Sequence, residues 1–265
     1  MSGAGKPGGM VDHRRENRAL WDEWSEDFQA LWNANTADGE APPAPSPFAP
    51  DAPGGPRPDL VPTVADRAYV ELGCGGGQGS VGTADLGADP VVGVDFSAKQ
   101  LRHARHLRDF YGVDATFVQG DVTDLPFADD RFDLASSETV LQMIEDLDAA
   151  LREARRVLRP GGVFVVSVPH PIHENLDRET GRFDGDYFDV GPRAIEIDDD
   201  YDADLISFDR TVADLHTALV DADFAVEALV EHQRHAVEEN DPADSDLPDV
   251  LWKVPQSVRF WAVAD

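Results

Sequence analysis

Residues 68–79, A-Y-V-E-L-G-C-G-G-G-Q-G, join a short apolar run to a dense group of glycines. Tyr69, Val70 and Leu72 predict a strand that is buried on both faces. Five of the next seven residues are glycine, which permits positive φ and lets the backbone approach a ligand closely because it has no Cβ. A helix after such a turn presents free N–H groups and the positive end of its dipole. We therefore expect a ligand-binding loop at the end of this strand.

The spacing of these glycines argues against a dinucleotide-binding loop. Counted from Gly73, the third glycine of G-x-G-x-x-G is replaced by Gln78. A second frame does match, but it begins five residues after Leu72, too late for the turn itself. An acidic residue followed by alternating glycines fits the strand end better: Glu71, Gly73, Gly75 and Gly77.

Alternating strands and helices follow the loop, which predicts a parallel sheet. The expected strands are residues 68–72, 91–94, 116–118, 132–135, 163–168, 224–230 and 258–263. The expected helices are residues 99–111, 146–158 and 210–222. Residues 159–162, R-P-G-G, are expected to turn the chain between a helix and the fifth strand.

Acidic residues come at the ends of the second and third strands. Asp95 follows V-V-G-V, and Asp121 follows the third strand. The carboxyl ends of parallel strands form the ligand crevice of an open α/β sheet, so Gly75, Asp95 and Asp121 should meet one nucleoside-like ligand. Asp95 would accept both ribose hydroxyls. Asp121 and the Val122 N–H would meet the edge of the base, and Phe96 its face. Each aspartate alone is better explained as a turn or capping residue. Acidic residues and glycines at the ends of three consecutive strands together favour a nucleoside-like ligand.

Three longer stretches resemble motifs of the class I S-adenosylmethionine-dependent methyltransferases. Residues 91–101 resemble the motif after the glycine loop, residues 117–144 the next motif with the fourth strand, and residues 151–168 the helix and fifth strand. Over residues 69–167 the chain resembles the broad "type 11" small-molecule methyltransferases. The resemblance implies a Rossmann-like, doubly wound α/β fold with a seven-stranded, mostly parallel sheet and an antiparallel last strand. It also implies S-adenosylmethionine as cofactor and S-adenosylhomocysteine as product.

The resemblance also assigns the methionine end of the cofactor. Ser137, just past the fourth strand, would offer its backbone carbonyl to the methionine amine, and Glu71 would contact the same end. Cys74 is expected to be a small packed residue within the loop. The full set of expected cofactor-binding residues is Glu71, Gly73, Cys74, Gly75, Gly77, Asp95, Phe96, Asp121, Val122 and Ser137.

The sequence identifies fewer residues that would bind or activate the methyl acceptor. His170, after the fifth strand, is the candidate general base, needed only if the acceptor keeps a proton of high pKa; a loop histidine between two prolines is the alternative. The acceptor pocket would be lined by Tyr187, Phe188 and Arg193. The alternative is that these side chains only pack against their own loop. Gln142 stands where the family often has His or Trp, which removes one candidate base. No metal site is expected, because His170 and His173 lack a cysteine partner or a helical spacing.

The chain divides into three expected parts. Residues 1–35 form a helical lid, because apolar residues recur at helical spacing over residues 12–32; a packing helix is the alternative. Residues 36–64 are proline-rich and form a linker or surface loop. Residues 65–265 form the cofactor-binding domain, with a polar insertion at about 170–205.

The charge balance is unusual, with 52 acidic and 22 basic residues and a net charge of −30. Acidic residues spread along the chain, with few lysines, suggest a cytoplasmic protein of a halophilic archaeon, where salt screens the repulsion; an ordinary acidic protein is the alternative. This charge disfavours nucleic-acid binding. There is no apolar run long enough for a membrane span and no secretory signal.

We expect an enzyme that methylates an O, N or C atom of a small molecule, as a monomer or homodimer. An RNA or protein methyltransferase is the first alternative, disfavoured because S-S-E-T at residues 136–139 replaces an N-P-P-Y type motif. A non-enzymatic cofactor-binding protein is the second. A nicotinamide dehydrogenase is disfavoured by the misplaced third glycine.

Overall fold

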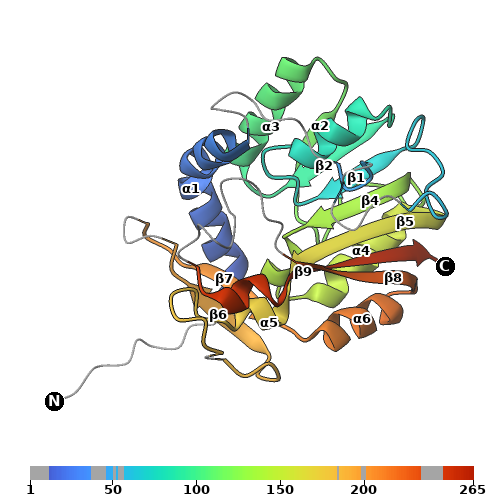
Figure 1. Ribbon diagram of the computed structural model, residues 1–265. Coiled ribbons are helices and arrows are strands. Elements are labelled where there is room, and N and C mark those ends of the chain that lie inside the picture. The colour runs from blue at the N-terminus through green and yellow to red at the C-terminus, as the bar shows by residue number, and fades with distance from the viewer. Residues whose placement is uncertain are drawn as a thin grey trace.

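A central sheet with helices on both faces organises the molecule (Figure 1). The computed structural model describes residues 12–36, 46–49, 52, 57–183, 185–197, 201–233 and 247–265. The sheet has seven strands in the order β3-β2-β1-β4-β5-β9-β8. Its strands are β1 Tyr69–Leu72, β2 Val91–Asp95, β3 Thr116–Gln119, β4 Phe132–Glu138, β5 Leu158–Pro169, β8 Phe224–Gln233 and β9 Pro255–Ala264.

The described helices are α1 His13–Thr36, α2 Gln78–Asp85, α3 Ala98–Tyr111, α4 Leu147–Val157, α5 Pro171–Glu174 and α6 Val212–Asp221. Two short 3-10 helices are η1 Leu141–Met143 and η3 Asp249–Trp252. A separate two-stranded hairpin is formed by β6 Gly191–Ile195 and β7 Leu205–Asp209.

The directions of the strands confirm the expected sheet. β1 pairs in parallel with β2 and β4, β2 with β3, and β4 with β5. β9 is antiparallel to both β5 and β8, so the last strand of the chain is the reversed one. The ligand-accessible carboxyl ends of β1, β2, β3 and β4 therefore lie along one edge of the sheet.

Alternation along β1 explains how the sheet acquires a core on each face. Tyr69 packs into one hydrophobic cluster, while Val70 and Leu72 pack into the other. All four residues of β1 are buried, as expected for a central parallel strand. The burial of this strand fixes the point at which the glycine loop begins.

One local expectation is corrected. β5 begins at Leu158, so residues 159–162 do not form a turn between elements; they lie within the strand, at a register shift relative to β4. The segment after β5, expected as a polar insertion, contains α5 and β6, and β6 pairs with β7 in a hairpin. The buried side chains of Ile206 and Phe208 give β7 a face that packs beneath α1.

The N-terminal helix α1 crosses the edge of the sheet, from α3 to the β6–β7 hairpin (Figure 1). Part of the proline-rich segment is packed against the domain, since Phe48 is buried edge-on against Tyr69 and Trp261, with ring centroids 5.8 and 5.9 Å away. Among the residues that the structure describes, none of the helices is both long and apolar enough to cross a membrane.

Candidate functional site

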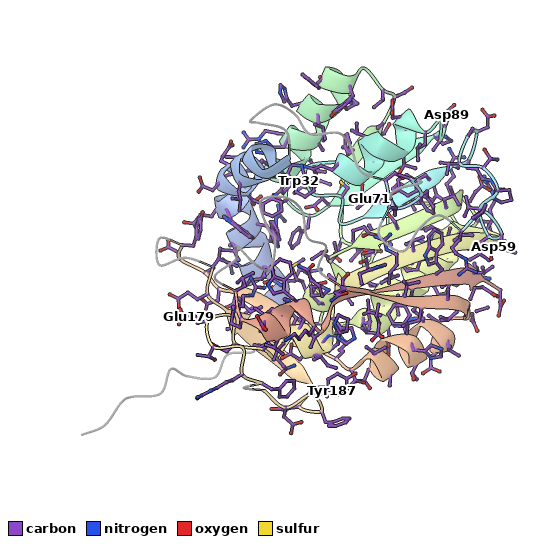
Figure 2. All side chains as sticks on the ribbon, in the orientation of Figure 1. Trp32, Asp59, Glu71, Asp89, Glu179 and Tyr187 are labelled. Carbon is purple, nitrogen blue, oxygen red and sulfur yellow. The ribbon has the colours of Figure 1, made fainter. Side chains whose placement is uncertain are left out.

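A cavity of about 790 Å³ lies between α1 and the carboxyl ends of β1, β2, β3 and β4. Glu71 and Trp32, labelled in Figure 2, line it from the sheet and from α1. Its volume lies in the upper part of the range of about 300–1,000 Å³ found for small-molecule sites.

The glycine loop forms one wall through close backbone packing. The Gly73 and Cys74 N–H groups both donate to the carbonyl oxygen of Val94, at 2.8 and 2.9 Å, which ties the loop to β2. Gly73 has φ +77°, and a Cβ there would lie 2.4 Å from a methyl group of Val140. Only glycine fits this position, and the backbone of the loop is thereby exposed to the cavity.

Asp95 is held rigidly at the end of β2. Its Oδ1 accepts from the Ser97 N–H at 2.8 Å, and its Oδ2 from the Gly75 N–H at 2.9 Å. Burial raises the pKa of Asp95 to about 6, although these N–H donors oppose the shift. A carboxylate has about four acceptor positions, so two remain for hydroxyl groups of a ligand.

Glu71 is a buried acid at the end of β1, only 5% exposed. The Ser80 hydroxyl donates to its Oε2 at 2.6 Å. Burial raises the pKa of Glu71 from 4.5 to about 8. A cation placed beside this side chain would favour its ionised form, so Glu71 suits the amino group of a ligand.

Asp121 connects the end of β3 to α1. Its Oδ1 accepts from the N–H and the hydroxyl of Thr123, at 2.9 and 2.8 Å, and its Oδ2 accepts from the Arg14 guanidinium of α1. Burial opposes ionisation, but the hydrogen bonds from Thr123 and Arg14 outweigh it and lower the pKa of Asp121. The carboxylate therefore stays charged and links sheet and helix.

Most of the expected cofactor residues meet in this one cavity. Those that line it are Glu71, Gly73, Cys74, Gly75, Asp95, Phe96, Asp121 and Val122. Two do not. Gly77 packs against Ala104 and Phe117, and Ser137 is buried with its hydroxyl donating to the carbonyl oxygen of Leu72 at 3.1 Å.

His170 lies outside the residues that line the cavity, although it follows β5 as expected. It caps the N-terminus of α5, where its Nδ1 accepts from the Ile172 N–H at 3.1 Å, and its Nε2 lies 2.9 Å from Glu231. Burial lowers the pKa of His170 against the opposing effect of Glu231. Both ring nitrogens thus have structural partners, and this placement gives no support to a role as general base.

The expected loop residues of the acceptor pocket also lie elsewhere. The Tyr187 hydroxyl accepts from the Val212 N–H, and Arg193 pairs with Asp209 and Glu174. Phe188 is 78% exposed. None of Tyr187, Phe188 and Arg193 is among the described residues that line the cavity.

The aromatic residues of α1 line one side of the cavity. Trp21, Trp24 and Phe28 contact one another with ring centroids 5.0–5.2 Å apart, and Trp32 extends the same wall. Polar contacts fix the helix at both sides. The Asn17 side chain donates to the Ile206 carbonyl at 2.8 Å, and Asp22 accepts from the Ser97 hydroxyl at 2.7 Å.

Other lining residues were not anticipated from the sequence. They include Arg14, Glu138, Met143, Phe208 and Arg259. Glu138 ends β4, so the rule that points to Asp95 at the end of β2 would also have found it. Arg259 lies in an antiparallel strand, where the strand-end rule does not apply. Among the described residues there is no cluster of three or more His, Cys, Asp or Glu side chains that could hold a metal ion.

Residues 70–166 match the family model described as "Methyltransferase domain". This part of the chain therefore resembles a methyltransferase domain. A solved S-adenosylmethionine-dependent methyltransferase from Mesorhizobium loti has a similar fold. Its TM-score is 0.65 at 29% identity, and the match covers 77% of this chain and 94% of that one.

Curated relatives match about half of the chain. A demethylmenaquinone methyltransferase from Renibacterium salmoninarum is 37% identical over 114 residues, which cover 43% of this chain and 46% of the relative. A fatty-acid O-methyltransferase from Mycolicibacterium smegmatis is 30% identical over 136 residues, 51% of this chain and 49% of the relative. The chain spans about half the length of the curated relatives it matches.

Proposed function

We propose that the protein is an S-adenosylmethionine-dependent methyltransferase that acts on a small molecule and forms S-adenosylhomocysteine as its second product. The observation that carries the proposal is the convergence of Gly75, Asp95 and Asp121 on one cavity. The named activities of the relatives, on a quinone precursor and on fatty acids, support a small apolar acceptor.

The residues present fit the proposed cofactor. Asp95 has acceptor positions left for two ribose hydroxyls, and the glycine loop leaves its backbone accessible. Glu71 offers a carboxyl group to the methionine amine. Asp121 and the Val122 N–H would recognise the edge of the adenine ring, and Phe96 would contact its face; all three residues line the cavity.

The cofactor supplies a methyl group on a positively charged sulfur, and the protein's part is to align the acceptor with it. Alignment of two bound molecules supplies much of the acceleration of such a displacement. The aromatic roof of α1 excludes water from the space between them. We therefore assign α1 as a lid, within the proposed division into residues 1–35, 36–64 and 65–265.

Two alternative functions are disfavoured, an RNA methyltransferase by the charge of the chain and a non-enzymatic cofactor-binding protein by the cavity. A net charge of −30 disfavours the binding of RNA, whose phosphates are also negative. A protein that only bound the cofactor would not need the apolar space lined by Met143 and Phe208, beyond the glycine loop. We extend the proposal to a cytoplasmic protein of a salt-accumulating organism, based on the excess of acidic residues.

Calorimetry with S-adenosylhomocysteine in molar KCl tests the cofactor assignment. The full chain should bind it, and Asp95→Asn should weaken binding by about 10-fold to 100-fold, because a hydrogen bond to a charged group contributes about 1.5–3 kcal/mol. Absence of binding by the unmodified chain would refute the proposal. Label transfer from S-adenosylmethionine into total RNA, but not into a metabolite extract, would replace the small-molecule acceptor with RNA.

A further inference from the structure

One charged pair in the cavity is not used by the proposed cofactor contacts. The Arg259 guanidinium donates from Nη2 to Oε2 of Glu138 at 2.7 Å, and both residues line the cavity. Glu138 ends β4, next to the glycine loop's own strand β1. The pair thus lies beside the proposed cofactor site, on the half of the sheet formed by β4, β5 and β9.

Register across three strands explains why these two side chains meet. Glu138 pairs with Ser167 of β5, and Ser167 pairs with Arg259 of β9, so the three residues form one row across the sheet. Neighbouring strands are about 4.8 Å apart, so two long side chains can meet above a small one. Ser167 is buried between them and leaves that space open.

The pair leaves hydrogen-bonding capacity on Glu138. A carboxylate accepts about four hydrogen bonds, and Arg259 supplies one of them. Oε1 of Glu138 is buried and, among the described residues, has no hydrogen-bond partner. Rotation about the last side-chain bond is soft, so either oxygen can turn toward the cavity, where the side chain is 30% exposed. Buried acceptor atoms in native proteins are almost always hydrogen-bonded, so we expect a ligand to donate a hydrogen bond to this carboxylate.

The surroundings define what kind of donor fits. Trp21, Met143, Ile144 and Phe208 line the same cavity, so the body of the ligand is apolar. Arg259 neutralises Glu138, so a cationic amine gains little from the pair. A hydroxyl suits it better, because negative charge that develops on the oxygen lies near the guanidinium. Burial also raises the pKa of Glu138 against the effect of Arg259, which favours proton uptake.

We propose that Glu138, held in place by Arg259, binds the hydroxyl group of the methyl acceptor, which is a flat apolar molecule of the phenol or naphthol class. The inference rests on the proposed methyltransferase function and names its substrate class. In the reaction, the hydroxyl O–H bond breaks and its proton moves to Glu138. The oxygen bonds to the methyl carbon, whose bond to sulfur breaks and leaves the electron pair on sulfur.

A comparison of two probes tests the role of Glu138. 2-Naphthol carries the hydroxyl, while 2-methoxynaphthalene keeps the ring but cannot donate. Binding of each to the full chain, saturated with S-adenosylhomocysteine in molar KCl, is measured by fluorescence titration. The unmodified chain should prefer 2-naphthol by about 10-fold to 100-fold, the range for a hydrogen bond to a charged group.

Glu138→Gln should reduce this preference by about tenfold, because a neutral amide accepts a weaker hydrogen bond, and should leave the affinity for S-adenosylhomocysteine unchanged. Glu174→Gln is the matched control, since Glu174 also pairs with an arginine, Arg193, but does not line this cavity; it should keep the preference. Glu138→Asp retains a charge for Arg259 and covers the case in which Glu138→Gln fails to fold.

Three results would overturn the proposal: no binding of 2-naphthol, no preference for it over 2-methoxynaphthalene, or a preference that survives in both Glu138 variants. Failure to bind S-adenosylhomocysteine is a separate outcome that refutes the proposed function. In that case, binding of 2-naphthol and 2-methoxynaphthalene is compared without S-adenosylhomocysteine. This comparison still decides whether Glu138 binds a hydroxyl. If the chain methylates 2-naphthol, the rate of methyl transfer should depend on the ionisation of Glu138. The pH profile of the rate should therefore show one ionisation that is absent from the profile of Glu138→Gln.

Discussion

Replacement of Glu71 by glutamine should change how the stability of the protein depends on pH. Burial raises the pKa of Glu71 from 4.5 to about 8. Between pH 4.5 and about pH 8, Glu71 keeps its proton in the folded chain but has lost it in the unfolded chain. The free energy of unfolding therefore falls as pH rises through this window and is flat above it. A shift of about 3.5 pKa units at 1.36 kcal/mol each gives an upper limit of about 5 kcal/mol.

Urea unfolding of the unmodified chain and of Glu71→Gln, at pH 5 and pH 9 in molar KCl, measures this contribution. Glutamine is close in shape to the protonated acid and can still accept from the Ser80 hydroxyl, which lies 2.6 Å from Glu71. The two proteins should be of similar stability at pH 5. At pH 9 Glu71→Gln should be more stable by several kcal/mol, up to about 5.

The comparison of the two proteins cancels the titration of all other groups that they share. Glu23→Gln, which removes an exposed carboxylate from α1, serves as control and should follow the unmodified chain at every pH. A difference between Glu71→Gln and the unmodified chain that is the same at pH 5 and pH 9 would refute the reasoning, because it would mean that Glu71 titrates alike in the folded and unfolded states.

Three further outcomes are expected. S-adenosylhomocysteine should expel the proton of Glu71 at neutral pH, so its calorimetric binding heat should vary with the ionisation enthalpy of the buffer, and this variation should vanish in Glu71→Gln. Gly93→Ala should lower the free energy of unfolding by about 1–3 kcal/mol, because its Cβ would lie 2.7 Å from the Phe117 ring and 2.8 Å from the Cys74 sulfur; an unchanged thermal midpoint would contradict this. The thermal midpoint of the unmodified chain should rise from low to molar KCl as salt screens its net charge of −30, whereas a midpoint independent of KCl would argue against repulsion as a destabilising force.

The sheet and the proposed cofactor half of the site could be predicted because their signals are local. Each parallel strand is a short apolar run, and the residue that follows it lies at the same edge of the sheet as its neighbours. Glu71, Asp95 and Asp121 were found in this way, and all three line the cavity. Helical spacing of tryptophans likewise identified the wall contributed by α1.

The other half of the site depends on contacts that the strand-end rule does not describe. Arg259 reaches the cavity from an antiparallel strand, and Phe208 reaches it from β7, which was not among the expected strands. His170 occupies the expected strand end, but α5 begins at the next residue and its side chain turns to cap that helix. Position along a strand therefore fixes where a residue is, but not the direction of its side chain.

The part of the cavity wall formed by α1 comes from outside the segment that matches the family model. Residues 70–166 contain the glycine loop, Asp95 and Asp121, whereas α1, Phe208 and Arg259 lie before or after them. Under the proposed function, acceptor preference can therefore diverge through changes in α1 and the β6–β7 hairpin while the segment that matches the family model stays the same. Chimaeras that exchange residues 12–36 between such enzymes should inherit the acceptor range of the donor of that helix.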